Sequence, residues 1–232
     1  MTSLLAPVTD FSDLGIIFNP PTDIKGLDPA LHDTLANLVT VWNRKRARNS
    51  LRSRYADGKH RLRDVGFSIP PSMRSLEEVV GWPGKAVNAH AERCMFDGFV
   101  SPNSSDDSFD LNPILSANRW DIELPMAISS SMIHSCVFMT VSDGDESAGE
   151  PPVLTIPHSA QWSSALWNFR TRSLKAALTI DDVDDYARPT RFRLWTPWQV
   201  ITCQLGREWY VDDVWPHGLN RVPVEVLPYR PT

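Results

Sequence analysis

With 232 residues, 42% of them hydrophobic and 22% charged, the chain can bury a real core as one large or two small domains, which excludes disorder throughout. Its formal net charge of −5 argues against a dedicated, sequence-reading DNA-binding protein, because such proteins are usually basic. Three cysteines far apart in the sequence exclude a disulfide framework, and no apolar stretch is long enough to span a membrane.

Residues 1–27 are rich in proline and lack hydrophobic periodicity, which indicates an extended arm. The arm also lacks the basic segment of a signal peptide, so we expect a cytosolic protein or one assembled in a cytosol. A helix is predicted to begin at Asp28 and Pro29, because Asp is a good N-cap and Pro fits the first helical position. One face of this helix carries apolar residues at steps of three and four: Leu31, Leu35, Leu38 and Trp42.

The second half of this helix is strongly basic, because residues 44–63 contain nine Lys and Arg residues and one acid, Asp57. This basic half has two possible roles. It contacts an acidic ligand, which is nucleic-acid phosphate or a partner subunit, or it forms a solvated helix face. Only Tyr55 adds an aromatic ring, so base-specific recognition is not expected. Asp57 and Gly58 are predicted to end the helix. The candidate interface or DNA-contact residues are Arg44, Lys45, Arg46, Arg48, Arg52 and Arg54.

Residues 69–100 predict an extended segment, a helix and a strand. Ile69-Pro70-Pro71 is extended, because a residue before proline avoids the helical region. Ser75 and Glu78 have the spacing of a capping box, and the helix that they open is expected to run to Cys94 with a kink or break at Gly81-Trp82-Pro83-Gly84. Met95–Val100 is a predicted strand.

A polar loop at 101–107 leads to another predicted helix, which Asp110 could cap and Pro125 is expected to kink. Its apolar face carries Leu111, Leu115, Ile122, Met126 and Ile133.

From residue 136 the hydrophobic period shifts toward two, which predicts a series of strands separated by turn signals. The strands are expected at 136–141, 153–157, 165–170, 174–180, 190–196, 198–204, 208–214 and 222–227. The fold class is therefore α+β, with residues 28–135 mainly helical and residues 136–232 mainly antiparallel β.

No motif commits the chain to catalysis. Gly84-Lys85 lacks the spacing and the hydroxyl residue of a phosphate loop, and His90 and Cys94 would need two further ligands to hold zinc. Two acidic runs are either charged hairpin turns or oxygen ligands of a divalent ion. The runs are Asp143, Asp145, Glu146 and Glu150, and Asp181, Asp182, Asp184 and Asp185. We expect no catalytic, cofactor-binding or metal-binding residue.

Nine tryptophans are many for a chain of this size. Trp has a large apolar ring system and one N–H donor, so it is favoured both in cores and at interfaces. The tryptophans therefore fit either a large core or burial against neighbouring subunits.

Four segments, in order along the chain, resemble portal proteins of tailed bacteriophages, especially those of phages that infect actinobacteria. The first joins the Tyr55-Ala56-Asp57-Gly58 turn to Gly66-Phe67-Ser68-Ile69-Pro70-Pro71. The others are 79–99, 118–141 and 167–178, and the resemblance extends over about residues 28–230. Two departures from the family pattern are Ser135-Cys136, where a Gly-Arg pair is expected, and Pro125 within the long helix.

The resemblance implies that residues 28–232 form a portal wing-like α+β region. Stem, clip and crown would follow the matched region and are not in this chain, so we expect a fragment, a truncated product or one half of a split portal. A portal is a homo-oligomeric ring, most often of about twelve subunits, at one capsid vertex of the virion, and it is assembled in the host cytoplasm.

The implied role is structural, not enzymatic, and needs no cofactor. The ring would be the conduit for double-stranded DNA during packaging and ejection, and a docking platform for other virion components. The implied partners are further copies of the chain, the major capsid protein, terminase, the head–tail connector and double-stranded DNA without sequence specificity, with no membrane. The basic residues 44–63 would lie at a subunit interface or face packaged DNA.

Two alternatives come from other classes of protein. A metal-dependent nuclease would use the acidic runs, and it predicts carboxylates that converge in one cleft. A portal-derived adaptor would not form a channel, and it predicts a monomer with an exposed apolar patch rich in tryptophan.

Overall fold

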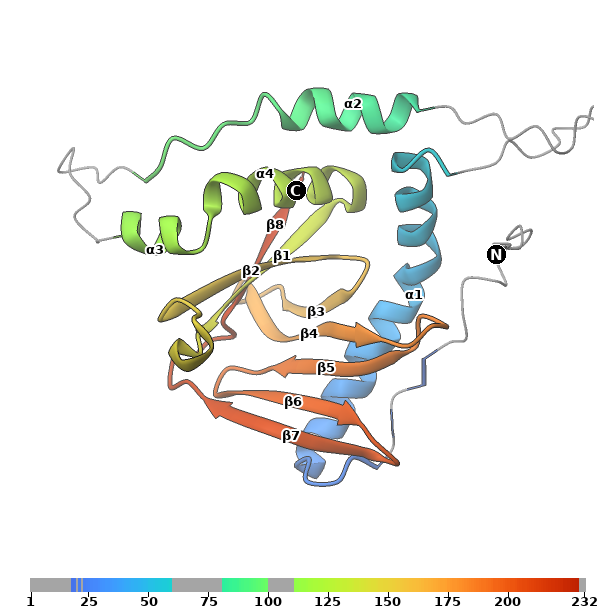
Figure 1. Cartoon of the computed structure of the whole chain (residues 1–232). Helices are drawn as coiled ribbons and strands as arrows, with labels where there is room; N and C mark the ends of the chain where they lie inside the picture. Colours follow the sequence, from blue (N-terminus) through green and yellow to red (C-terminus); the bar gives the residue numbers. More distant parts are fainter. Residues whose placement is uncertain (1–17, 20, 22, 60–80, 100–110, 230–232) are drawn as a thin grey trace, which may run out of the picture.

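The computed structural model describes residues 18, 19, 21, 23–59, 81–99 and 111–229. Its helical elements are the 3-10 turn η2 (Pro29–Leu31) and the helices α1 (His32–Ala56), α2 (Trp82–Ala91), α3 (Leu111–Ala117) and α4 (Trp120–His134). The strands are β1 (Cys136–Asp143), β2 (Val153–Ser159), β3 (Ser163–Asn168), β4 (Ser173–Val183), β5 (Pro189–Trp195), β6 (Gln199–Leu205), β7 (Trp209–Pro216) and β8 (Val224–Pro228), with the 3-10 turn η4 (Glu146–Ala148) between β1 and β2. Helices precede antiparallel sheets, which confirms the α+β prediction, and each strand predicted from residue 136 onward overlaps an observed one (Figure 1).

Capping residues at both ends of the first helix determine where it begins and ends. The Asp28 carboxylate accepts the N–H of Ala30 at 2.9 Å, and η2 continues directly into α1. Asp57 is the C-cap, and Gly58 follows with φ +66°, a left-handed conformation that glycine adopts without strain.

The larger sheet has the strand order β3-β4-β5-β6-β7, and α1 covers one of its faces (Figure 1). Leu35, Leu38 and Trp42 of α1 are buried against this face. The strands contribute Ala176, Leu178, Ile180, Phe192, Leu194, Ile201 and Cys203. These residues are spaced two apart within each strand, as expected for one face of a sheet. This is the main hydrophobic core.

The end of the N-terminal arm completes that core. Ile24 and Leu27 are buried in it, so this part of the arm is packed against the domain. Lys25 forms a parallel bridge to β7, in which its N–H donates to the Trp209 carbonyl and its carbonyl accepts the N–H of Val211, both at 3.0 Å.

The smaller sheet has the order β2-β1-β8 and packs on the other face of the larger one. Phe138 and Val224 meet Ala177, Trp195 and Val200 in a second apolar cluster. On the opposite face of β1 a third cluster joins the strand to α4, and it contains Ala127, Val137 and Met139. The small sheet therefore lies between the large sheet and α4.

The predicted strand at Met95–Val100 is wrong for residues 95–99, which have no strand conformation. The rings of Phe96 and Phe99 instead lie 5.7 Å and 6.2 Å from that of Trp120, centroid to centroid. These contacts with Trp120 of α4 leave Phe96 and Phe99 partly exposed, and they take the place of the predicted strand pairing.

The long helix predicted after residue 110 is two helices, because the chain turns at Asn118-Arg119, where Arg119 has φ +52°. The Asn118 side chain donates to the Val153 carbonyl at 2.8 Å and accepts the N–H of Thr155 at 2.7 Å. This tie to β2 fixes the break. Pro125 lies within α4 without ending it.

The predicted apolar face of this helix is also wrong in part. Ile122 and Met126 are exposed, and the buried residues of α4 are Ala127, Ser131 and His134.

The helix predicted to run to Cys94 ends at Ala91, and it begins at Trp82, within the predicted interruption. Pro83 occupies the first turn, where its missing N–H costs no hydrogen bond. The predictions for Ile69–Pro71, Ser75, Glu78, residues 101–107 and Asp110 lie outside the described residues. None of the helices in the described part of the chain is both long and apolar enough to cross a membrane.

Candidate interaction surfaces

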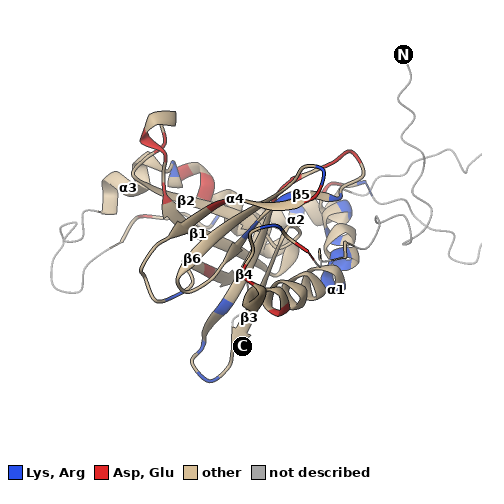
Figure 2. Cartoon of the chain, turned by 90° about the horizontal axis from the view of Figure 1, so that it is seen from below, with Lys and Arg blue, Asp and Glu red and all other residues tan. Residues whose placement is uncertain are grey.

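The six candidate basic residues of α1 divide into an exposed and an internal group. Arg44, Lys45 and Arg48 are exposed and form what we call the α1 basic face (Figure 2). Arg46 is only 9% exposed, and its guanidinium lies over the ring of Trp42, 4.9 Å from the centroid. It also donates to the Ala187 carbonyl at 2.7 Å, and burial lowers its pKa. Arg46 is therefore a structural link between α1 and the β4–β5 turn.

Arg52 and Arg54 are half-buried. The Arg52 guanidinium donates to the His134 carbonyl at 3.2 Å and to Ser135 Oγ at 3.0 Å, so it stabilises the C-terminus of α4. Burial lowers the pKa of His134, and the charge of Arg52 lowers it further. Of the other basic residues in this stretch, Lys59 pairs with Asp57 at 3.2 Å, while Arg61 and Arg63 lie outside the described residues.

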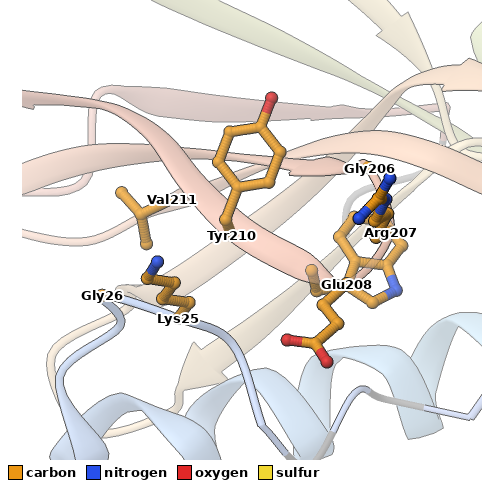
Figure 3. A pocket seen from close by; sticks show the side chains of 8 residues that line it. Lys25, Gly26, Gly206, Arg207, Glu208, Tyr210 and Val211 are labelled. Atoms are coloured by element: carbon orange, nitrogen blue, oxygen red, sulfur yellow. The ribbon is translucent and has the colours of Figure 1, made fainter.

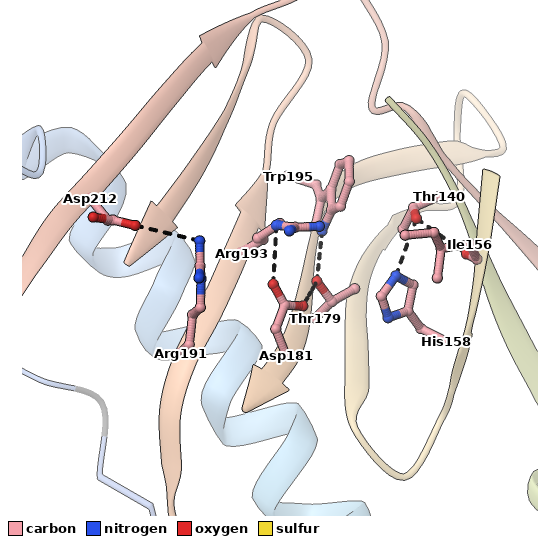
Figure 4. A network of polar contacts seen from close by, with 9 residues as sticks. All are labelled: Thr140, Ile156, His158, Thr179, Asp181, Arg191, Arg193, Trp195 and Asp212. Carbon is pink, nitrogen blue, oxygen red and sulfur yellow. Dashed lines mark hydrogen bonds and ion pairs between the residues drawn. The ribbon is translucent and has the colours of Figure 1, made fainter. Parts of the chain in front are cut away.

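A polar network crosses the face of the large sheet that is turned away from α1 (Figure 4). Arg193 Nε lies 3.0 Å from Asp181 Oδ2, and Thr179 Oγ1 donates to the same carboxylate at 3.3 Å. The indole N–H of Trp195 donates to Thr179 Oγ1 at 3.0 Å. Burial raises the pKa of Asp181, while Arg193 opposes that shift by favouring the carboxylate. The network satisfies polar groups between the two sheets.

His158 belongs to the same polar layer. Its Nε2 lies 3.2 Å from Thr140 Oγ1, which in turn donates to the Ile156 carbonyl at 3.2 Å. Burial, helped by the positive charge of Arg193, lowers the pKa of His158 to about 4. The imidazole is therefore neutral near pH 7.

Both acidic runs begin at the end of a strand and continue into the turn that follows: Asp143 ends β1, and Asp181 and Asp182 belong to β4. In the same run, Asp184 pairs with Arg188 at 2.7 Å in the β4–β5 turn, and Asp181 forms the separate pair with Arg193 described above. In the β1–β2 connection, Asp145 accepts the N–H of Ser147 at 2.9 Å, and Asp143 accepts the indole N–H of Trp215 at 3.0 Å.

The described part of the chain contains no group of three or more His, Cys, Asp or Glu residues placed to hold a metal ion. His90 and Cys94 are both exposed, and the Cys94 thiol lies 3.5 Å from the His90 carbonyl. The nuclease alternative requires carboxylates that converge in one cleft, and the described carboxylates of the two acidic runs form no such group.

The described residues line two surface hollows that are large enough to admit a ligand or a partner side chain. One, of about 680 Å³, lies between Lys25-Gly26 and the β6–β7 hairpin, where Arg207, Glu208 and Tyr210 line it (Figure 3). The other, of about 650 Å³, lies between the β3–β4 hairpin, the turn at Pro197-Trp198 and residues 220–225. We call the second one the hairpin groove. Among their described lining residues, neither hollow pairs a nucleophile with a general base.

The sequence-based candidates did not include the hairpin groove, because it joins three segments that are far apart in the chain. The sequence does contain a signal for it: residues 151–180 include Arg170, Arg172 and Lys175 but no acid. Trp42 and Trp195 are in the cores, while Trp82, Trp167 and Trp198 are exposed, and burial of the exposed tryptophans against neighbouring subunits stays a prediction.

No family profile matches the chain. Curated proteins similar to it include the "Portal protein" of Mycobacterium phage L5, 26% identical over 182 residues, which are 76% of this chain and 37% of that protein. Another is the "Portal protein" of Mycobacterium phage D29, 26% identical over 213 residues, which are 88% of this chain and 42% of that protein. The chain spans about two fifths of the length of these relatives. The resemblance to portal proteins of actinobacterial phages is confirmed.

Proposed function

We propose, from the relationship of this chain to mycobacteriophage portal proteins, that it is a structural subunit of a portal ring at a capsid vertex. In that role it contributes to the conduit for double-stranded DNA during packaging and ejection, and to the platform on which terminase and the head–tail connector dock. The observation that carries the proposal is the similarity to two portal proteins over at least 76% of the chain.

We assign residues 28–232 to the wing, the flange that packs against neighbouring subunits and the capsid. A closed ring needs two different contact faces on each subunit, because the repeated contact is heterologous. The α1 basic face, formed by Arg44, Lys45 and Arg48, is one candidate for such a contact or for contact with DNA phosphate. The net charge of −5 suits a conduit, because strong attraction to phosphate would hold the duplex in place.

Assembly of the purified 232-residue chain, followed by native mass spectrometry and negative-stain electron microscopy, tests ring formation. We expect a closed ring of about twelve copies, with each subunit using two different faces. A chain that stays monomeric at every concentration would contradict ring closure by this chain and would favour the adaptor alternative.

Charge reversal of the α1 basic face tests its role in that ring. The variant combines Arg44→Glu, Lys45→Glu and Arg48→Glu, and it keeps the buried Arg46. A matched control reverses three exposed cations elsewhere, Lys85, Arg93 and Arg207, with the same change in net charge. If the face is a subunit contact, only the first variant loses rings, whereas unchanged assembly would exclude that contact.

A further inference from the structure

The hairpin groove presents apolar and basic side chains together. Trp198, which is 66% exposed, lines the groove, and Phe169, at the tip of the β3–β4 hairpin, is 86% exposed. Trp167 and Leu174 add further apolar lining. Large apolar side chains that are exposed close together are typical of interaction sites, so the groove is suited to a partner with an apolar component.

The charged residues near the tip of the β3–β4 hairpin are all basic. Arg170, Arg172 and Lys175 are exposed, and none of the ion pairs formed among the described residues includes them. Opposite the hairpin, Arg221 lies 3.5 Å from Glu225, which is the only acid among the described residues that line the groove. The partner is therefore expected to be acidic.

The β1–β2 connection of the same chain has the complementary properties. It carries Asp143, Asp145, Glu146 and Glu150, and residues 136–169 contain no Lys or Arg. Pro151 and Pro152 follow directly and provide flat apolar rings of the kind that dock against exposed aromatic side chains.

This connection is also locally ordered. Asp145 caps η4, and the Asp145 N–H donates to the Glu150 carboxylate at 2.8 Å. A charged segment that is already ordered loses less conformational entropy when it binds.

The two surfaces lie on different sides of the molecule, the acidic connection beside α3 and the basic hairpin beyond β3 and β4 (Figure 2). They therefore cannot satisfy each other within one chain. A contact between the connection of one copy and the groove of the next is heterologous, and repetition of such a contact produces a ring when the rotation closes.

We propose that the hairpin groove binds the acidic β1–β2 connection of a second copy of this chain. The inference deepens the proposed function, because it names the contact through which neighbouring subunits associate. Duplex DNA is the other ligand that a basic surface could attract, but its phosphates would leave the exposed rings of Trp198 and Phe169 without an apolar contact.

Charge reversal on each side, and on both sides together, tests the contact. The groove variant combines Arg170→Glu, Arg172→Glu and Lys175→Glu. The connection variant combines Glu146→Lys, Ser147→Lys, Ala148→Lys and Glu150→Gln, which keeps the backbone hydrogen bonds of the Asp145 cap, an acceptor for the Asp145 N–H and the Asp143–Trp215 hydrogen bond. The connection then carries three lysines and two carboxylates. The doubly changed chain again has opposite charges on the two surfaces.

Analytical ultracentrifugation at low and high salt measures how strongly each variant self-associates. We expect each one-sided variant to weaken self-association about tenfold at low salt, and the doubly changed chain to return to within about fivefold of wild type. The exposed-site control Arg93→Glu with Arg207→Glu should associate as wild type does. One-sided variants that associate normally, or a doubly changed chain that does not recover, would overturn the proposal. A groove variant that self-associates normally but no longer binds duplex DNA would also overturn the proposal.

A cross-linking experiment locates the contact directly. Chain labelled with nitrogen-15 is mixed with unlabelled chain and treated with a carbodiimide, which joins a carboxylate to an amine that touches it. We expect a link from Lys175 to Glu146 or Glu150 that contains one labelled and one unlabelled peptide. Absence of that link in assembled rings overturns this inference and leaves the proposed function standing. A chain that never associates overturns the contact, and the location of the chain on phage particles then decides the portal role separately.

Discussion

The α1–sheet region and the layer formed by α2, α3 and α4 use apolar residues in different ways. Leu38, Val39 and Trp42 of α1 are buried in one continuous core with the five-stranded sheet. In the helical layer, Trp82, Met95 and Met126 are exposed, and the buried residues are small or polar. Burial in the α1–sheet region is therefore expected to supply most of the folding free energy, while apolar side chains of the helical layer contribute little to it.

Replacement of one tryptophan by alanine in each region is expected to show the largest difference in the free energy of unfolding. Trp42 is 1% exposed and donates its indole N–H to the Gln161 carbonyl at 2.8 Å, whereas Trp82 is 78% exposed. We expect Trp42→Ala to lower the free energy of unfolding by about 3–5 kcal/mol, because it leaves a large cavity. Trp82→Ala should change it by less than about 0.5 kcal/mol. Urea denaturation measures both, and equal losses would show that the two regions do not differ.

Stability of the sheet region is also expected to depend on pH through His158. Its pKa is about 4 in the folded chain, against an ordinary value of 6.5, so the unfolded chain binds more protons between these values. Stability therefore falls as the pH falls from about 6.5 toward 4, by up to about 3 kcal/mol. His158→Gln keeps a donor for Thr140 and should remove this part of the pH dependence. Denaturation curves of both proteins at pH 7 and pH 4.5 check it, and parallel losses would contradict the assignment.

The junction of the two regions is close-packed at Gly84. A Cβ atom at this position would lie 2.4 Å from the Ala56 carbonyl oxygen at the end of α1, whereas one at Gly81 would meet nothing within 4 Å. We expect Gly84→Ala to cost about 1–2 kcal/mol, because α2 must move away from α1. Gly81→Ala is the matched control and should be neutral or slightly stabilising. Thermal unfolding compares them, and a stable Gly84→Ala protein would show that α2 can move without cost.

The smallest effect is expected at Ser135, between α4 and β1. Ser135 has φ +75°, a left-handed conformation in which a Cβ atom is strained and glycine is not. Replacement by Gly or by Ala removes the same Oγ hydrogen bond from Arg52. We expect Ser135→Gly to be more stable than Ser135→Ala by about 1 kcal/mol. Denaturation curves that coincide for the two variants would exclude backbone strain at this position.

Much of the α1–sheet region could be predicted from sequence, because its signals are local. Asp28, Pro29 and the spacing of Leu35, Leu38 and Trp42 are sufficient to place the first helix, and alternation places the strands. The helical layer depends on distant contacts instead. The break between α3 and α4 is fixed by hydrogen bonds from Asn118 to residues 35 and 37 positions away, which no local pattern contains.

The same limit applies to the candidate surfaces. The basic composition of α1 marks it as a candidate contact surface, which stays a prediction, but composition cannot show that Arg46 turns onto Trp42 or that Arg52 binds the end of α4. The hairpin groove depends on how the β3–β4 hairpin, Trp198 and residues 220–225 meet in space. Only its charge, a stretch from 151 to 180 without any acid, was visible beforehand.

The location of the chain on phage particles tests the central claim most directly. Gold-labelled antibodies against this chain, viewed by electron microscopy on intact and on disrupted particles, show where it resides. A portal subunit predicts label at one vertex of each particle, with the label retained on isolated head–tail junctions. Particles without label, or with label spread over the whole shell, would contradict the portal assignment.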